Sequence, residues 1–133
     1  MVSKKQKGNN AENELAKHYR NLGFKVQVAQ RTSVFTGKFY VSRDNDFFNL
    51  FDLMVLNNLA ISFVQVKTNA SHVYAVKPLI EKFSKELDND YLMYNVALRV
   101  SRKGWVLWSY YENKWTKRFF DLKFKNCEPF KYS

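Results

Sequence analysis

The spacing of apolar residues in the first part of the chain predicts a helix followed by a strand. One apolar stripe at helical spacing consists of Ala11, Leu15, Ala16, Tyr19 and Leu22. Asn9 can cap this helix, with Glu12 at capping-box spacing, and Gly23 is the residue type that commonly ends one. Residues 24–28 then alternate apolar and polar side chains, as a half-buried strand does.

Residues 29–50 show no clear period. Residues 36–38 are typical of a turn and residues 39–41 of a short strand, whereas the rest of the segment is polar. We therefore predict a loop-rich insertion around residues 29–50.

The middle of the chain predicts a β-hairpin. Residues 51–56 are apolar apart from Asp52, Asn57 and Asn58 indicate a turn, and residues 61–68 form the second strand.

The second half predicts a helix and then further strands. Pro78 suits the first turn of a helix, whose apolar residues recur at helical spacing before residues 88–90 break it. Strands are expected at residues 94–100 and 105–111, and weak alternation suggests another at residues 115–124. The predicted order, α-β-β-β-α-β-β, indicates a single-domain α/β fold with a central mixed β-sheet flanked by helices.

Length and composition agree with one folded domain. The chain has 133 residues, of which 46% are hydrophobic and 17% aromatic, and this argues against disorder. Its single cysteine, Cys127, cannot form an internal disulfide, and no apolar run approaches the roughly 18 residues of a membrane span. The basic start lacks the apolar stretch of a signal peptide, so we expect a soluble, intracellular protein of the cytoplasm.

The charge is strongly positive and unevenly distributed. There are 22 Lys and Arg residues against 12 Asp and Glu, a formal net charge of +10. Residues 1–40 and 67–133 each carry +6, whereas residues 41–66 carry −2. Such an excess points to a polyanionic partner, most commonly nucleic acid, because neutralised phosphates release counterions. A solvated basic surface on a structural protein is the alternative.

Several polar residues occupy positions where the pattern favours apolar ones. Asp52 begins an otherwise apolar strand, and Gln65 and Lys67 share one face of the neighbouring strand because they are two residues apart. Glu12, in the first helix, could reach the same end of the sheet. Oxygen ligands suit Mg²⁺ and a lysine can stabilise charge on a phosphate, so the set fits metal-assisted phosphodiester cleavage. A structural ion pair between Asp52 and Lys67 is the alternative.

Three segments, residues 7–15, 51–55 and 64–68, resemble the signature of the archaeal Holliday junction resolvases, a branch of the PD-(D/E)XK nuclease superfamily. The similarity agrees in order and spacing and extends over most of residues 7–112. It implies a restriction-endonuclease-like fold and a magnesium-dependent DNA endonuclease, for which Mn²⁺ can substitute. It also implies a homodimer that acts on branched DNA such as Holliday junctions, in recombination or repair.

Carried over by position, the resemblance implies four catalytic residues, Glu12, Asp52, Gln65 and Lys67. Asp52, Gln65 and the backbone carbonyl of Val66 would bind the metal, and Glu12 would bind it through a water molecule.

The sequence departs from the resolvase pattern in two places. The second acidic ligand is usually Glu, and Gln65 keeps an oxygen there but removes one charge, so metal should bind more weakly. The segment 29–50 is longer than in the compact resolvases, which should alter the DNA structure that is bound. Because of Gln65, a nucleic-acid-binding protein with a nuclease fold and a weakened or inactive metal site remains the alternative.

Candidate DNA contacts lie next to the predicted site. Residues 1–7 are expected to form a basic N-terminal arm before a nuclease-like domain of residues 8–133. Lysines of this arm, and polar residues that follow the first strand, are reasonable phosphate contacts. These candidates are Lys4, Lys5, Lys7, Arg31, Thr32 and Ser33.

Other side chains have simpler explanations. Arg102 and Lys103 are as consistent with ordinary solvated charge as with a DNA contact. His18 and His72 lack a second ligand at metal spacing, which favours structural roles. Aromatic residues at 105–115 alternate in strands, which favours packing in the core or in a dimer over stacking on bases.

Overall fold

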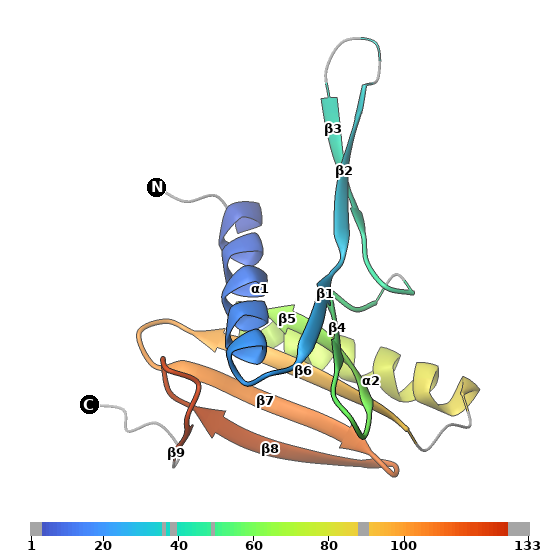
Figure 1. Cartoon of the computed structure of the whole chain (residues 1–133). Coiled ribbons are helices and arrows are strands. Elements are labelled where there is room, and N and C mark those ends of the chain that lie inside the picture. Colours follow the sequence, from blue (N-terminus) through green and yellow to red (C-terminus); the bar gives the residue numbers. More distant parts are fainter. Residues whose placement is uncertain (1–3, 36, 38–39, 49, 88–90, 128–133) are drawn as a thin grey trace.

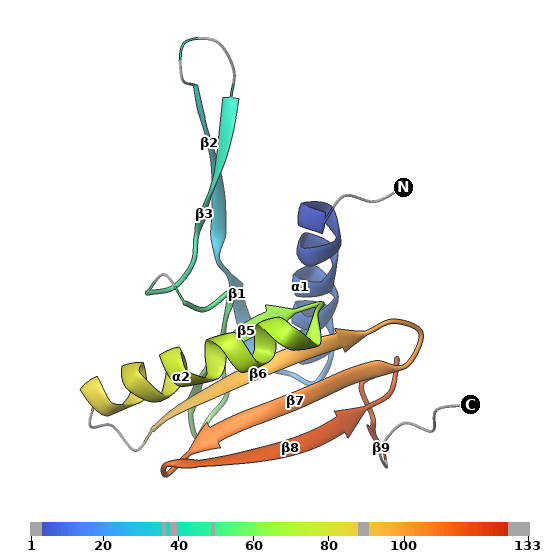
Figure 2. The ribbon, with the colours of Figure 1, turned by 180° about the vertical axis from the view of Figure 1, so that it is seen from behind.

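In a computed structural model of the chain, two helices and a seven-stranded sheet form three layers (Figures 1 and 2). The structure describes residues 4–35, 37, 40–48, 50–87 and 91–127; for residues 4–7, 30–35 and 40–45 it describes the backbone alone. The helices are α1 (Lys4–Asn21) and α2 (Ala70–Glu86). The strands are β1 (Lys25–Val28), β2 (Gln30–Phe35), β3 (Tyr40–Asn45), β4 (Leu53–Leu56), β5 (Ile61–Lys67), β6 (Leu92–Val100), β7 (Gly104–Tyr111), β8 (Lys114–Phe120) and β9 (Asn126–Cys127).

The large sheet is mixed, as predicted. Its strand order is β1-β4-β5-β6-β7-β8-β9, and every neighbouring pair is antiparallel except β5 and β6. α2 makes the crossover connection that parallel strands require. The observed element order contains four strands beyond the predicted order. β8 matches the further strand expected at residues 115–124, and β3 overlaps the short strand expected at residues 39–41, whereas β2 and β9 were not predicted.

Strand alternation separates two apolar cores, one on each face of the sheet. On one face, Leu15 of α1 packs with Leu53 and Val64. On the other face, Ile80 of α2 packs with Val96. Each fully buried side chain of this kind contributes roughly 1.5–3 kcal/mol relative to an exposed one. The helices are thereby fixed on opposite faces, and the adjoining ends of β4 and β5 lie between them.

α1 begins earlier than its predicted start near Asn9. The helix starts at Lys4, so residues 4–7 of the predicted arm are helical and Gly8 lies inside the helix. Lysine and glutamine are good helix formers, and this offsets the unfavourable propensity of one glycine. The predicted end is confirmed, because Gly23 follows the helix with a φ of 93°.

α2 also begins earlier than predicted. Its N-cap is Asn69, whose side chain accepts a hydrogen bond from the backbone N–H of Ser71 over 3.0 Å. Pro78 therefore lies inside the helix and not in its first turn. The proline removes one helical hydrogen bond, but buried Val76 and Ile80 on either side of it hold the helix on the sheet. Neither described helix is long and apolar enough to span a membrane.

The segment predicted as a loop-rich insertion contains a regular hairpin. β2 and β3 pair antiparallel from Gln30 opposite Asn45 to Phe35 opposite Tyr40. Its apolar residues are confined to the two positions of each strand next to the turn, so the hairpin lacks the alternation that indicates a half-buried strand. The hairpin extends away from the large sheet, in the same direction as the N-terminal half of α1 (Figures 1 and 2).

The hairpin predicted in the middle of the chain is confirmed. β4 and β5 pair antiparallel with Leu53 opposite Val64. In the turn between them, the side chain of Asn57 accepts hydrogen bonds from the backbone N–H groups of Leu59 and Ala60, both over 2.8 Å. This register brings the start of β4 next to the end of β5.

Candidate active site

Asp52 lies immediately before β4, between β1 and β5. Its backbone N–H donates to the carbonyl of Val64 over 2.9 Å, and its carbonyl accepts from the N–H of Ala29 over 2.8 Å. Its side-chain Oδ2 accepts from the N–H of Val66 over 2.8 Å. The residue is 5% exposed. Both the backbone and the carboxylate are therefore held by the neighbouring strands.

Gln65 and Lys67 lie on the adjacent strand, β5. Asp52 is hydrogen-bonded to Val64 and Val66, the two neighbours of Gln65 in β5, so Gln65 lies close to Asp52. Gln65 is 7% exposed, whereas Lys67 is only half-buried. Because side chains alternate along a strand, Gln65 and Lys67 share the face of the sheet that α2 covers. The strand therefore presents a buried amide and an accessible ammonium group near one carboxylate.

Glu12 approaches the same carboxylate from α1. It is 7% exposed, next to Ala11 on the side of the helix that packs against the sheet. Its negative charge raises the pKa of Asp52. The four residues predicted as catalytic are thus related through Asp52: Gln65 by strand register, and Glu12 and Lys67 by charge.

The pKa of Asp52 is raised to about 8. Burial is the largest cause, and the negative charges of Glu12 and Asp46 add to it. The N–H of Val66 and the ammonium of Lys67 lower the pKa, but by less. A carboxyl with this pKa keeps its proton at neutral pH in the absence of a cation. Because a bound cation favours the ionised form, the site is electrostatically suited to hold one.

Asp46 is a member of the site that the sequence pattern did not single out. It follows β3 and is half-buried, and its charge acts on Asp52. The only signal in the sequence was the acidic segment 41–66, which contains both residues. Their proximity depends on the hairpin returning the chain to the start of β4.

The donors of the site fit a hard divalent cation. Carboxylate and amide oxygens suit Mg²⁺, which commonly binds through one or two carboxylates and keeps several waters. Within the described part of the chain, no three His, Cys, Asp or Glu side chains are arranged to hold a metal ion. The amide oxygen of Gln65 as a ligand beside the carboxylate of Asp52 stays a prediction. For Val66 the structure shows the N–H bonded to Asp52, and the role of its carbonyl stays a prediction.

The predicted DNA contacts lie on elements that border this site. The backbones of Lys4, Lys5 and Lys7 are in the first turns of α1, and residues 31–33 are in β2. The side chains of Lys4, Lys5, Lys7, Arg31, Thr32 and Ser33 lie outside the described part of the chain. Their contacts with DNA remain a prediction.

The structural role expected for His18 agrees with its surroundings, whereas the role of His72 stays a prediction. The ring of His18 stacks on Phe124 at 5.1 Å, and its Nε2 lies 3.8 Å from a carboxylate oxygen of Glu14. Burial lowers the pKa of His18. His72 is exposed on α2.

Core packing is also confirmed for most aromatic residues of β7. Those that are buried in the sheet are Trp105, Trp108 and Tyr110, whereas Tyr111 is exposed.

Comparison with known proteins gives a likeness in structure but none in sequence. No protein-family model matches the sequence, and no curated protein matches it. The fold is similar to the 1.6 Å structure of Archaeoglobus fulgidus Hjc, a Holliday junction resolvase from an archaeal hyperthermophile. The sequences are 18% identical, the TM-score is 0.46, and the likeness covers 75% of this chain and 74% of that one. These comparisons assign the chain to no family.

Proposed function

We propose that this protein is a divalent-metal-dependent DNA endonuclease that hydrolyses phosphodiester bonds in branched DNA such as Holliday junctions. The observation that carries the proposal is the buried carboxylate of Asp52, bonded to the strand that bears Gln65 and Lys67 and flanked by Glu12. The sequence resemblance to the archaeal resolvases and the net charge of +10 support a DNA substrate.

Asp52 and Gln65 would hold the cation directly, with the carbonyl of Val66, and Glu12 would contribute through a water molecule. When bound, Mg²⁺ or Mn²⁺ supplies a water of lowered pKa and neutralises charge on the phosphate. Gln65 contributes an oxygen without a charge, so the site holds one negative charge fewer than a site with Glu at this position. We therefore expect a requirement for relatively high metal concentration.

Lys67 acts on the substrate. The residue is half-buried, and its ammonium group can donate hydrogen bonds to a non-bridging oxygen of the phosphate and to the attacking water. The charge that builds on the phosphate during attack is stabilised by this fixed positive group. Asp52 also benefits, because Lys67 lowers the pKa of its carboxyl and favours the ionised form.

A four-way junction is resolved by two opposed cuts, and a chain with one site can make both only as a homodimer. Light scattering coupled to size exclusion tests this part of the proposal. A mass of twice 15.8 kDa supports it, and a monomer in the presence of junction DNA contradicts it.

Cleavage of labelled four-way junction, flap and duplex DNA in Mg²⁺ or Mn²⁺ tests the function itself. We expect cutting of branched DNA by the wild type and none by Asp52→Ala. No cleavage of any substrate above the level of Asp52→Ala contradicts the proposal.

One observation favours a second candidate, a nucleic-acid-binding protein with a weakened metal site. In the described part of the chain, no three acidic or other ligating side chains form a metal group, and Gln65 replaces an acid. This candidate predicts tight, salt-sensitive DNA binding that metal does not change. Cleavage by Gln65→Glu together with inactivity of the wild type would favour it over the first.

A further inference from the structure

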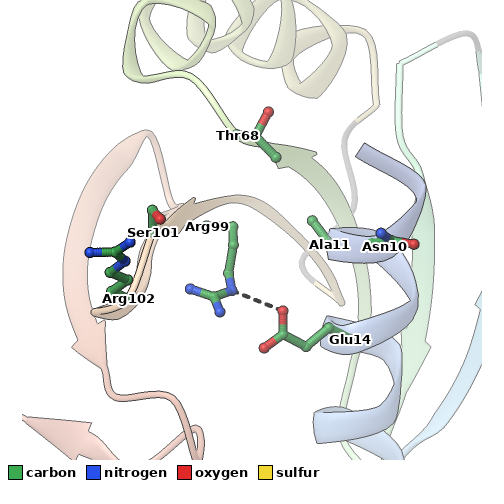
Figure 3. A pocket seen from close by; sticks show the side chains of 7 residues that line it. All are labelled: Asn10, Ala11, Glu14, Thr68, Arg99, Ser101 and Arg102. Atoms are coloured by element: carbon green, nitrogen blue, oxygen red, sulfur yellow. Dashed lines mark hydrogen bonds and ion pairs between the residues drawn. The ribbon is translucent and has the colours of Figure 1, made fainter. Parts of the chain in front are cut away.

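A pocket lies between α1 and the ends of β5 and β6 (Figure 3). Its volume is about 200 Å³. Its lining residues are Asn10, Ala11, Glu14, Thr68, Arg99, Ser101 and Arg102. Glu12 and Glu14 are two residues apart on a helix with 3.6 residues per turn, so they point to opposite flanks of α1. Glu12 is directed toward the start of β4, and Glu14 toward the end of β6.

Arg99 is held rigidly in this pocket. Its Nε donates to a carboxylate oxygen of Glu14 over 2.8 Å (Figure 3). Its Nη1 donates to the carbonyls of Val100 over 2.7 Å and Gly104 over 3.3 Å. The guanidinium group also lies over the ring of Trp105, 5.6 Å from its centre.

The pocket is rich in hydrogen-bond donors and carries net positive charge. Arg99 and Arg102 bring two positive charges, and Glu14 brings one negative charge that Arg99 already neutralises. Thr68 and Ser101 add hydroxyl groups. Guanidinium groups match the geometry of phosphate oxygens and bind them through paired hydrogen bonds. The chemistry of the pocket therefore fits a phosphate group.

The pocket is also close to the proposed catalytic site. Thr68 directly follows Lys67, and the pocket residue Arg99 lies on β6, two strands from the start of β4. Two strand spacings correspond to about 10 Å. The pocket lies on the face of the sheet that α1 covers and Lys67 on the face that α2 covers, and Thr68 and Lys67 are adjacent at the end of β5. A DNA strand that crosses this end of the sheet could therefore contact both.

We propose that this pocket binds an internucleotide phosphate of the substrate near the one that is cleaved. The inference rests on the proposed nuclease function, and it assigns to Arg102 and Thr68 a role in substrate binding. Glu14 positions Arg99 and neutralises its charge while no DNA is bound. The pocket then fixes where along a strand the scissile phosphate meets Lys67.

Affinity for fluorescent four-way junction DNA, measured by anisotropy in EDTA at several salt concentrations, tests this proposal without cleavage. Arg102→Asn is a suitable variant, because Arg102 is exposed with a φ of 64° and Asn tolerates this conformation. We expect roughly three- to tenfold weaker binding. The slope of log affinity against log salt concentration should fall by about one, as for the loss of one phosphate contact. Thr68→Val, which keeps the shape, should weaken binding without changing the salt dependence.

Lys114→Asn is the matched control. Lys114 is exposed at the start of β8, opposite Tyr111 at the far end of β7, on the order of 25 Å from the pocket along a strand of eight residues. Equal losses in Arg102→Asn and Lys114→Asn would show a general effect of charge and overturn the proposal. Unchanged affinity and salt dependence in Arg102→Asn would also overturn it. Because EDTA prevents cleavage, absence of nuclease activity would contradict the proposed function without affecting this result.

A second measurement distinguishes an internucleotide phosphate from free phosphate. Single phosphates of the junction are replaced, one at a time, by uncharged methylphosphonates. We expect one position at which the wild type loses affinity and Arg102→Asn does not. If inorganic phosphate alone shifts the Nε–H resonance of Arg99 but no such position exists, the pocket takes free phosphate and the proposal is wrong.

Discussion

The carboxylate of Asp52 accepts a hydrogen bond from the backbone N–H of Val66, with 2.8 Å between Oδ2 and the nitrogen. This bond joins the start of β4 to the strand that carries Gln65 and Lys67. Because the N–H belongs to a strand of the sheet, the direction of the carboxylate is set by the fold. Burial among these strands also disfavours the ionised form of the carboxyl, so orienting the group costs stability once the group is charged.

In the metal-free protein, Asp52 should reduce stability increasingly as pH rises. Its pKa is about 8 in the folded state and about 3.8 in the unfolded chain. Between these values the unfolded state binds fewer protons, so the free energy of unfolding falls with rising pH. Asp52→Asn removes this loss while its amide oxygen can still accept from Val66. The free energy of unfolding of the variant should exceed that of the wild type, and the difference should grow by on the order of 1 kcal/mol per pH unit.

Urea unfolding of both proteins in EDTA, at pH 5 and at pH 8, measures this difference. A difference between them that is the same at both pH values would contradict the assignment of a raised pKa to Asp52.

Divalent cations should stabilise the wild type through Asp52. Binding requires the ionised carboxylate, so it displaces a proton and strengthens as pH rises. At a concentration 100 times the dissociation constant, Mg²⁺ would add about 2.7 kcal/mol to the free energy of unfolding. Thermal unfolding with MgCl₂, compared with KCl at equal ionic strength, measures the effect. Equal stabilisation of Asp52→Asn would place the bound cation elsewhere.

Most elements could be predicted because they carry a local pattern. The stripe that contains Leu15 predicted α1, and the apolar run at residues 51–56 predicted the first strand of the central hairpin. The hairpin of β2 and β3 was not recognised, since its strands carry no regular apolar alternation in sequence and pair with one another in a separate two-stranded sheet. The start of α2 was misplaced because Pro78 was taken as a first-turn residue and Asn69 was overlooked as the cap.

The members of the candidate site that lie in or next to strands with a clear apolar pattern could be predicted from the sequence. Asp52, Gln65 and Lys67 interrupt apolar patterns, so sequence alone could place them together. Asp46 could not be found in this way, because it reaches Asp52 only through the return of the hairpin. The pocket around Arg99 was missed for the same reason, as α1 and the turn after β6 meet only in the folded protein.

Gln65→Glu should strengthen metal binding and lower the stability of the metal-free protein. A second carboxylate beside Asp52 adds a charged ligand, but without a cation it adds repulsion among buried acids. We expect half-maximal cleavage at a lower Mg²⁺ concentration and a lower free energy of unfolding in EDTA. Gln65→Met, which removes the oxygen at similar size, serves as the opposite control. If all three proteins require the same Mg²⁺ concentration, Gln65 is not a ligand.

Two glycines should respond to alanine in opposite directions. Gly104 has a φ of 140°, and an added Cβ would lie 2.1 Å from the carbonyl oxygen of Phe120, so Gly104→Ala should cost about 3 kcal/mol or more. Gly8 lies inside α1 with no atom within 4 Å of such a Cβ. Gly8→Ala should therefore stabilise by about 0.5–1 kcal/mol. Chemical unfolding checks both values, and equal effects of the two changes would contradict the local geometry.

The central claim is that Asp52 belongs to a site that hydrolyses DNA. The most direct test is the single-turnover rate of junction cleavage in Mn²⁺ for the wild type and for Asp52→Asn, purified in parallel and matched in fold and DNA affinity. We predict a rate at least about 100-fold lower for the variant, equivalent to about 3 kcal/mol of lost transition-state stabilisation. Equal rates would show that the cleavage does not come from this site, and would contradict the claim.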